Sequence, residues 1–411
     1  MSVSEADLVA ATRRLREHPI DHGAWLEVAA LLAALGHADD AELAFAALGE
    51  GACRGGQVAL AVACGRYLAQ TGSLRGSELV DRVVETYAAS DAVPGKRPPL
   101  RGEAPPAGSG RGAPVLARGD GTLLPLEDAR RVVAALGAWL TSREVPKVPP
   151  APLLSALPRP AARALIGVMT AHAVQAGSVI IEIGAPASSL FWLAHGTASV
   201  SRQDGAELGE LHSGAFFGEI ALVGGTRRTA RVAAASDAWL LEIPARAIEA
   251  AAQKHPGLAE VLALHARARL LANLVRTSEL FRALADDDRD ALLGKLETRL
   301  VPAGTTFIRE GRPNEHLWVV VSGRCEVRAA GSSISELGPG AAVGEISLVS
   351  GAPAVADVVA IEPAVLLRLS KRDFDVVARR HPALLAEVEK LVVARETANR
   401  ALFQDASDLI V

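Results

Sequence analysis

Apolar and polar residues follow two different patterns along this chain. Through residues 4–90, which are rich in Ala and Leu, apolar residues recur at spacings of three and four, and this period predicts amphipathic helices. From residue 153 onwards, short runs of Val, Ile, Leu and Trp are separated by turn glycines, as in Ser178–Ile183, Leu190–Leu193 and Leu317–Val321. These runs predict brief strands, and their arrangement favours a barrel or jelly roll over βαβ units.

The strand-rich part contains one pattern twice. Glycines and a Gly-Glu pair of the first copy return 126 or 127 residues later, which is too regular for chance. The matching pairs are Gly177 and Gly304, Gly184 and Gly311, Gly196 and Gly323, Gly218-Glu219 and Gly344-Glu345, Gly225 and Gly351, Ala230 and Ala356, and Val232 and Val358. The sequence therefore predicts two copies of one β-rich module.

These patterns predict an α+β multidomain protein whose N-terminal helical segment precedes two β-jelly-roll barrels with flanking helices. The linker between them is Pro/Gly-rich and nearly free of aromatic residues, so it is expected to be disordered. In chain order, the expected parts are a helical domain (1–90), the linker (91–124), a helix at about 126–142 with a Pro-rich bridge (125–150), the first module (151–275) and the second module with a C-terminal helix (276–411). The modules are expected to end in helical stretches at about 245–275 and 371–403.

The N-terminal helices resemble a tetratricopeptide repeat. The positions that carry this resemblance are Trp25, Ala29, Leu32, Gly36, Ala41 and Phe45, with a weaker second copy from Val58 through Leu60, Cys64, Tyr67 and Gly72. A generic Ala-rich helical bundle is the alternative. Under either interpretation, this short platform is more plausible as a docking surface for a protein partner than as a catalyst.

Composition and motifs exclude several function classes. The net charge is −4 and the pI is near 6.2, so we expect no nucleic-acid partner and no general attraction to anionic membranes. Three scattered cysteines argue against a disulfide framework or a zinc site. The start of the chain lacks signal-peptide features and no apolar run is long enough to span a membrane, which predicts a cytoplasmic protein. No catalytic motif was found, so we expect no enzyme activity, metal or cofactor.

The first module contains a segment suited to bind a sugar phosphate, FGEIALVGGTRRTARV, at residues 217–232. Gly218 and Glu219 open a short apolar helical turn, whose backbone N–H groups suit an anion. Ten residues past Gly218, Arg228 supplies a planar fork of donors that matches phosphate geometry. Glu219 cannot bind phosphate, so a role in accepting from sugar hydroxyls fits it better.

This segment resembles the phosphate-binding cassette of cyclic nucleotide-binding domains, and the flanking glycines extend the likeness over about 230 residues. The resemblance implies that Glu219 accepts from the ribose 2′-hydroxyl, that Arg228 pairs with the cyclic phosphate and that Thr229 lies beside the phosphate and the base. The implied ligand-binding set is Gly218, Glu219, Ile220, Ala221, Arg228, Thr229 and Ala230; Val200, Leu211 and Val232 are candidates for an apolar wall. Arg227 stands where the family usually has proline.

The second module departs from the family pattern at the phosphate position. Ala354 stands where Arg228 stands in the first module, and Asp357 stands where Arg231 does. Losing such a contact typically costs about 2–5 kcal/mol, and Glu345 would then repel a phosphate. We therefore expect the second module to be silent for cyclic nucleotide, while another ligand there stays open.

Two functions from different classes follow. The first is a cyclic nucleotide receptor and signalling adaptor, with cAMP favoured over cGMP on family frequency, in which the helical stretch after the first barrel transmits the change to the second barrel and to an unknown protein partner. This layout resembles the regulatory subunits of cyclic nucleotide-dependent kinases. The second is a structural scaffold that binds no nucleotide. His265 and Arg269 are candidates to cap the base, and a homodimer through the C-terminal helix stays an alternative.

Overall fold

The computed structural model describes residues 3–88, 113–114, 116, 124–142, 154–201, 205, 207–219, 227–255, 257–259, 261–262, 292–380, 382, 385–386, 388–390 and 392–393. Most of the predicted linker and the Pro-rich bridge lie outside these residues. By its internal contacts the chain divides into two compact units. The first contains the described residues up to 183, with 188–219 and 230–262; the second contains 184–187, 227–229 and the described residues from 292 onwards.

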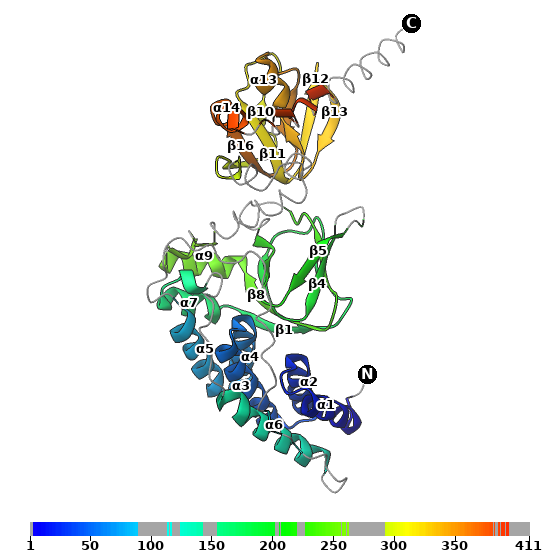
Figure 1. Ribbon diagram of the computed structural model, residues 1–411, viewed down its shortest axis with the longest axis vertical. Coiled ribbons are helices and arrows are strands. Elements are labelled where there is room, and N and C mark those ends of the chain that lie inside the picture. Colours follow the sequence, from blue (N-terminus) through cyan, green and yellow to red (C-terminus); the bar gives the residue numbers. More distant parts are fainter. Residues whose placement is uncertain are drawn as a thin grey trace. The chain divides into compact units, whose positions relative to one another are not determined.

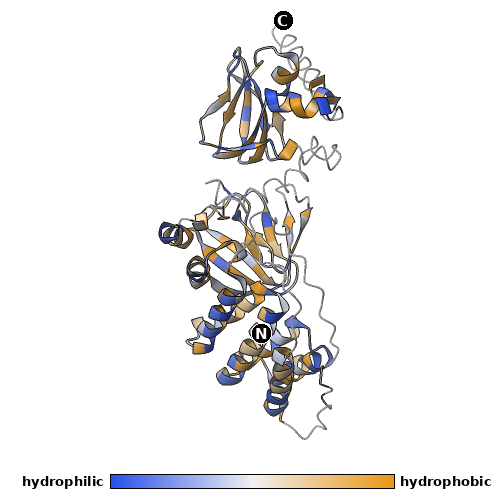
Figure 2. Ribbon diagram, turned by 60° about the vertical axis from the view of Figure 1, so that its left-hand side comes forward, coloured by the Kyte–Doolittle hydropathy of each residue, from blue (hydrophilic) through white to orange (hydrophobic). Residues whose placement is uncertain are grey.

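The N-terminal part is helical, as its apolar period predicts (Figure 1). Its helices are α1 (Glu5–Glu17), α2 (His22–Ala34), α3 (Ala38–Gly55), α4 (Val58–Gln70), α5 (Leu74–Tyr87) and α6 (Pro125–Ser142). Glycines turn the chain between α2 and α3 and between α4 and α5, with φ of 86° at Gly36 and 85° at Gly72. Hydrophilic and hydrophobic residues occur together in the helical layer (Figure 2), while α4, which is buried throughout Val58–Gly65, lies between its neighbouring helices and the first barrel.

Helix α6 belongs to the same helical layer although it follows the predicted linker. It packs against α1 and α3, and its Arg130 Nε donates to Asp40 Oδ1 at 2.8 Å. Asp128 of α6 pairs with Arg16 of α1. The hairpins α2–α3 and α4–α5 fit both a tetratricopeptide repeat and a plain helical bundle, so the tetratricopeptide interpretation stays a prediction. Within the described part of the chain, no helix is long and apolar enough to cross a membrane.

The two modules fold alike, each as two four-stranded antiparallel sheets. In the first, the sheet orders are β1-β8-β3-β6 and β2-β7-β4-β5; in the second, they are β9-β16-β11-β14 and β10-β15-β12-β13. The first set is β1 (Thr170–Val174), β2 (Val179–Ile181), β3 (Ser189–His195), β4 (Thr197–Ser201), β5 (Glu207–His212), β6 (Phe216–Phe217), β7 (Arg231–Ala234) and β8 (Ala238–Pro244). The second set is β9 (Glu297–Val301), β10 (Thr306–Ile308), β11 (His316–Ser322), β12 (Cys325–Ala329), β13 (Ser332–Leu337), β14 (Ala342–Val343), β15 (Asp357–Ala360) and β16 (Ala364–Ser370). The predicted jelly rolls are thus confirmed.

The repeated glycines have a shared backbone reason. In three of the repeated pairs, both glycines have a positive φ, a backbone angle that favours glycine. They are Gly177, Gly184, Gly196, Gly304, Gly311 and Gly323. At Gly196 a Cβ would lie 2.5 Å from the Asp237 carbonyl oxygen, and at Gly323 it would lie 2.3 Å from that of Pro363. The two copies therefore turn at the same places under the same steric demand.

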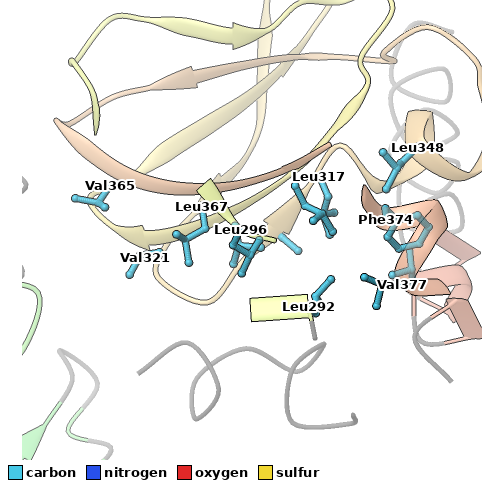
Figure 3. Packing of buried hydrophobic residues seen from close by; sticks show 13 residues of the cluster. Leu292, Leu296, Leu317, Val321, Leu348, Val365, Leu367, Phe374 and Val377 are labelled. Carbon is cyan, nitrogen blue, oxygen red and sulfur yellow. The ribbon is translucent and has the colours of Figure 1, made fainter. Parts of the chain in front are cut away.

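Short helices flank each barrel. In the first module these are η1 (Leu154–Ala156), α7 (Arg159–Gly167) and α9 (Ala245–Lys254); in the second they are α13 (Glu345–Ser350) and α14 (Lys371–Arg380). Apolar residues of the second barrel's outer sheet face pack with Leu292, Phe374, Val377 and Val388 (Figure 3). The second barrel therefore covers this face with residues of its own module.

The outer face of the first barrel is covered instead by the N-terminal helices. Helix α4 lies against β1, β3 and β8, and the rings of Phe45 and Tyr67 contact Trp239 of β8 at centroid distances of 5.4 and 5.5 Å. At the edge strand β1, Gln70 accepts a hydrogen bond from the Ala171 N–H at 3.0 Å, so a helix side chain satisfies a backbone donor at the open edge of the sheet. The helical platform and the first barrel thus share one core rather than only a linker.

Replacing Trp239 by alanine tests this shared core. Trp239 is 8% exposed, and truncating a buried tryptophan typically costs about 3–5 kcal/mol. We expect a lower urea midpoint for the transition in which the N-terminal helices and the first barrel unfold, and we expect both to unfold together. Val179→Ala, at an exposed position of β2, is the control and should change stability by less than about 0.5 kcal/mol. Unfolding of the helices separately from the barrel would contradict the shared core.

A histidine pair at the same interface makes stability depend on pH. An added Cβ on Gly23 would lie 3.1 Å from Nε2 of His195, so α2 begins directly against the end of β3. Burial and the neighbouring His195 lower the pKa of His22 to about 4, against a weaker opposing effect of Asp21. An unfolded histidine has a pKa near ~6.5, so below that pH the unfolded chain binds a proton that the folded chain does not.

We therefore expect the contribution of neutral His22 to the free energy of unfolding to be present in full above pH ~6.5 and to be lost as the pH falls toward 4. At pH 5 this loss should amount to about 2 kcal/mol. Chemical denaturation at pH 7.5 and pH 5 measures this loss. His22→Asn should reduce the pH dependence, because asparagine does not titrate. An equal dependence in both proteins would show that other groups cause it.

Candidate functional site

Few charged side chains are buried in the part of the chain that the structure describes. Across the described residues, the buried charged side chains are Glu219, Arg228 and Glu345, at 4%, 6% and 1% exposure. Burying a charge is costly unless it is paired or hydrogen-bonded, so such positions are usually functional or part of a network. All three occupy the predicted cassettes, two in the first module and one in the second.

The first of these residues follows strand β6. This strand pairs with β3 at Phe217 and Phe191, whose rings stack at 5.4 Å, and the chain then turns at Gly218 with φ of 89°. The turn requires glycine and places Glu219 directly after the strand. Ile220 and Ala221, which were predicted to contribute to the ligand site, lie outside the described residues.

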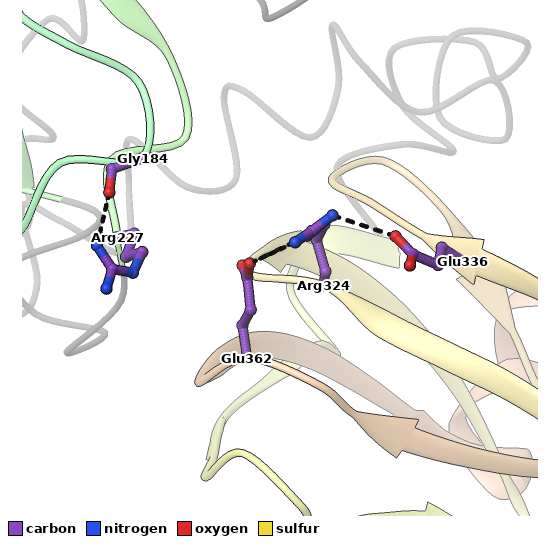
Figure 4. Close-up of polar contacts among 5 residues, drawn as sticks. All are labelled: Gly184, Arg227, Arg324, Glu336 and Glu362. Atoms are coloured by element: carbon purple, nitrogen blue, oxygen red, sulfur yellow. Dashed lines mark hydrogen bonds and ion pairs between the residues drawn. The ribbon is translucent and has the colours of Figure 1, made fainter.

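The backbone fixes Arg228 against a neighbouring turn. Its N–H donates to the Ala185 carbonyl at 2.9 Å, and its own carbonyl accepts from the Gly184 N–H at 2.8 Å. Arg227 pairs with Pro186 in an isolated β-bridge, and its exposed guanidinium donates to the Gly184 carbonyl at 2.9 Å (Figure 4). The arginine that replaces the family's usual proline therefore ties the cassette to the same turn.

The remaining predicted residues are buried or half-buried where the structure describes them. Thr229 and Ala230 follow Arg228 and are half-buried. The three proposed wall residues share the apolar core of the first barrel, where Leu211 and Val232 are buried and Val200 is half-buried. His265 and Arg269, the candidates for capping the base, lie outside the described residues.

The second module keeps the same backbone frame without the arginine. Ala354 N–H donates to the Arg312 carbonyl at 2.9 Å, and the Ala354 carbonyl accepts from Gly311 at 2.8 Å. These bonds match those of Arg228 one repeat earlier. The copies also share the Gly-Glu turn, since Gly344 has φ of 90° and Glu345 follows it at the start of α13. The two sites therefore differ in their side chains, above all at the position of Arg228.

Two features of the second module had no signal in the sequence. Asn314 Nδ2 donates to the carbonyl of His316 at 2.8 Å and to that of Gly344 at 3.3 Å, which holds the cassette turn against β11. Arg324 bridges Glu362 and Glu336 at the other end of the barrel (Figure 4). Neither follows from periodicity, because the Asn314–Gly344 and Arg324–Glu362 contacts join residues 30 and 38 positions apart.

Other chemistry is scarce in the part of the chain that the structure describes. Its residues contain no group of three or more side chains placed to hold a metal ion. Cys53, Cys64 and Cys325 are buried free thiols.

The chain thus belongs to the class of proteins built from two jelly-roll modules, each with a Gly-Glu cassette turn. Residues 171–255 and 298–381 each match the family model of the cyclic nucleotide-binding domain. The chain therefore contains two regions that match the cyclic nucleotide-binding domain, as its cassette predicts.

Three comparisons show where similar modules occur. The Pycsar effector protein XpPycTIR of Xanthomonas perforans is 30% identical over 135 residues, which cover 33% of this chain and 44% of the effector. The cGMP-dependent protein kinase egl-4 of Caenorhabditis elegans is 27% identical over 217 residues, 51% of this chain and 27% of the kinase. The regulatory domain of Toxoplasma gondii PKA, solved with cAMP, is 20% identical with a TM-score of 0.29, and the match covers 60% of this chain and 92% of that one. The chain spans less than half the length of the effector and of the kinase.

Proposed function

We propose that this protein is a cyclic nucleotide receptor that binds one nucleotide, in its first module. One contrast carries this proposal: the same backbone frame presents a buried arginine at 228 and an alanine at 354. A buried guanidinium suits a cyclic phosphate because its charge-assisted hydrogen bonds are strong where water is excluded. Glu219 would accept from the ribose hydroxyl, and cAMP is favoured over cGMP.

The proposed output is regulatory rather than catalytic. Helix α9 leaves β8 and contacts α7, and α7 contacts α5 of the helical layer. Arg163 of α7 pairs with Asp81 of α5, and Ser155 Oγ donates to the Tyr87 carbonyl at 2.9 Å. A shift of α9 on nucleotide binding would therefore reach the N-terminal helices, which we propose as the surface for a cytoplasmic protein partner. A ligand can drive such a shift only by its differential affinity for the two states.

Calorimetric titration of cAMP and of cGMP into the full chain tests the proposal. We expect one site per chain, with cAMP the tighter ligand. A stoichiometry of two would contradict the silent second module. If neither nucleotide gives heat or raises the melting temperature, the receptor proposal fails and the alternative, a scaffold that uses the same folds, takes its place.

A further inference from the structure

The second module retains the sugar-binding half of its cassette. Glu345 is almost fully buried, and the turn before it is sterically fixed: a Cβ on Gly344 would lie 2.5 Å from the His316 carbonyl oxygen. A carboxylate has two oxygens and about four acceptor positions, so it can serve a diol in addition to contacts within the protein. A decayed site would be expected to lose a buried carboxylate, because burying it costs free energy.

The phosphate-binding half is absent. Ala354 is 7% exposed, and Val355 stands where Thr229 stands in the first module. Within the described residues of the second module, no cation is buried. The neighbouring Arg312 is exposed to solvent, so it cannot replace a desolvated guanidinium. A buried carboxylate without a buried cation disfavours an anionic ligand and tolerates a neutral one.

An indole N–H supplies an unused donor in the same cluster. Trp318 of β11 is 8% exposed, and its Nε1 has no hydrogen-bond partner. Its ring is held by Phe307, at a centroid distance of 5.2 Å, and by Arg368, whose Cζ lies 5.8 Å from the ring centroid. Arg368 is itself paired with Glu297. Trp318 and Ala354 belong to one apolar cluster, so the unsatisfied donor and the arginine-free position share the same core.

From these three observations we propose that the second module binds a nucleoside, that is, a neutral ligand with a ribose diol and a base but no phosphate. Glu345 accepts from the diol, the Trp318 N–H donates to an acceptor of the ligand, and Ala354 and Val355 leave the phosphate position apolar. The proposal rests on the proposed role of the cassette carboxylate in holding ribose.

Titration of the full-length Glu219→Gln, Arg228→Ala protein with adenosine, guanosine and their 5′-monophosphates tests the inference, because the first site then lacks both the cassette carboxylate and the arginine. One nucleoside should bind at one site per chain, and its 5′-monophosphate should bind at least tenfold more weakly. Adding Glu345→Gln should weaken the nucleoside at least tenfold. Glu315→Gln removes an exposed carboxylate before β11 and is the matched control, with unchanged affinity expected.

Three results would overturn the inference: no binding of either nucleoside, tighter binding of the monophosphate, or an affinity that Glu345→Gln leaves unchanged. Parallel titration of cAMP into the unsubstituted chain separates this inference from the proposed function. Binding of cAMP without nucleoside binding refutes only the nucleoside site. Nucleoside binding without cAMP binding refutes only the receptor.

Discussion

Arg228→Ala is expected to weaken cyclic nucleotide binding by roughly 30-fold to several thousandfold. Truncating one partner of a buried charge pair typically costs about 2–5 kcal/mol, and the arginine is only 6% exposed. The variant should fold, because the second module holds alanine at the same position with the same two backbone hydrogen bonds. Calorimetry gives the affinity, and the melting temperature without ligand checks the fold.

Two further variants sharpen this result. Arg228→Lys keeps the charge but loses the planar fork, so it should bind with intermediate affinity. Arg231→Ala removes a half-exposed arginine that pairs with Glu182, and it should bind like the parent protein. A loss in Arg231→Ala as large as that in Arg228→Ala would mean that general positive charge, rather than one guanidinium, attracts the ligand.

The double substitution Ala354→Arg and Val355→Thr is expected to create a second cyclic nucleotide site. The frame around Ala354 already matches that around Arg228, and Glu345 is in place, so restoring the two side chains should raise the stoichiometry from one to two. Adding a large side chain to a packed position typically costs about 1–3 kcal/mol, so the melting temperature should fall without ligand and recover with it.

Ala354→Gln with Val355→Thr is the matched control, since it adds a polar chain without the charge. It should leave the stoichiometry of cyclic nucleotide at one. If the arginine variant is folded and also binds a single nucleotide, the difference between the two modules lies beyond these positions.

Much of this architecture could be predicted from local sequence. The turn glycines were recognisable because positive φ at positions such as Gly196 and Gly323 excludes other residues, so both copies had to keep them. The cassettes were recognisable because Glu219 and Arg228 lie in one continuous segment, residues 217–232. The strands β3 and β11 followed from their apolar runs.

The packing of the helical layer could not be predicted in this way. Tyr67 and Trp239 meet although 171 positions of sequence separate them, and each would suit any apolar surface. The same limit applies to α6, whose amphipathic pattern predicted a helix but not its place on α1 and α3. The unsatisfied N–H of Trp318 also had no signal, because a tryptophan in a strand is usually a core residue.

The coverage of Trp239 by the N-terminal helices has a consequence for how such a protein can evolve. The match to the family model begins at residue 171, whereas the folded core of the first module also includes α4. Recombination that moved residues 171–255 alone into another gene would expose an aromatic face and favour aggregation. The second module carries Leu292 and Phe374 to cover its own face, so it is the copy suited to exchange between genes.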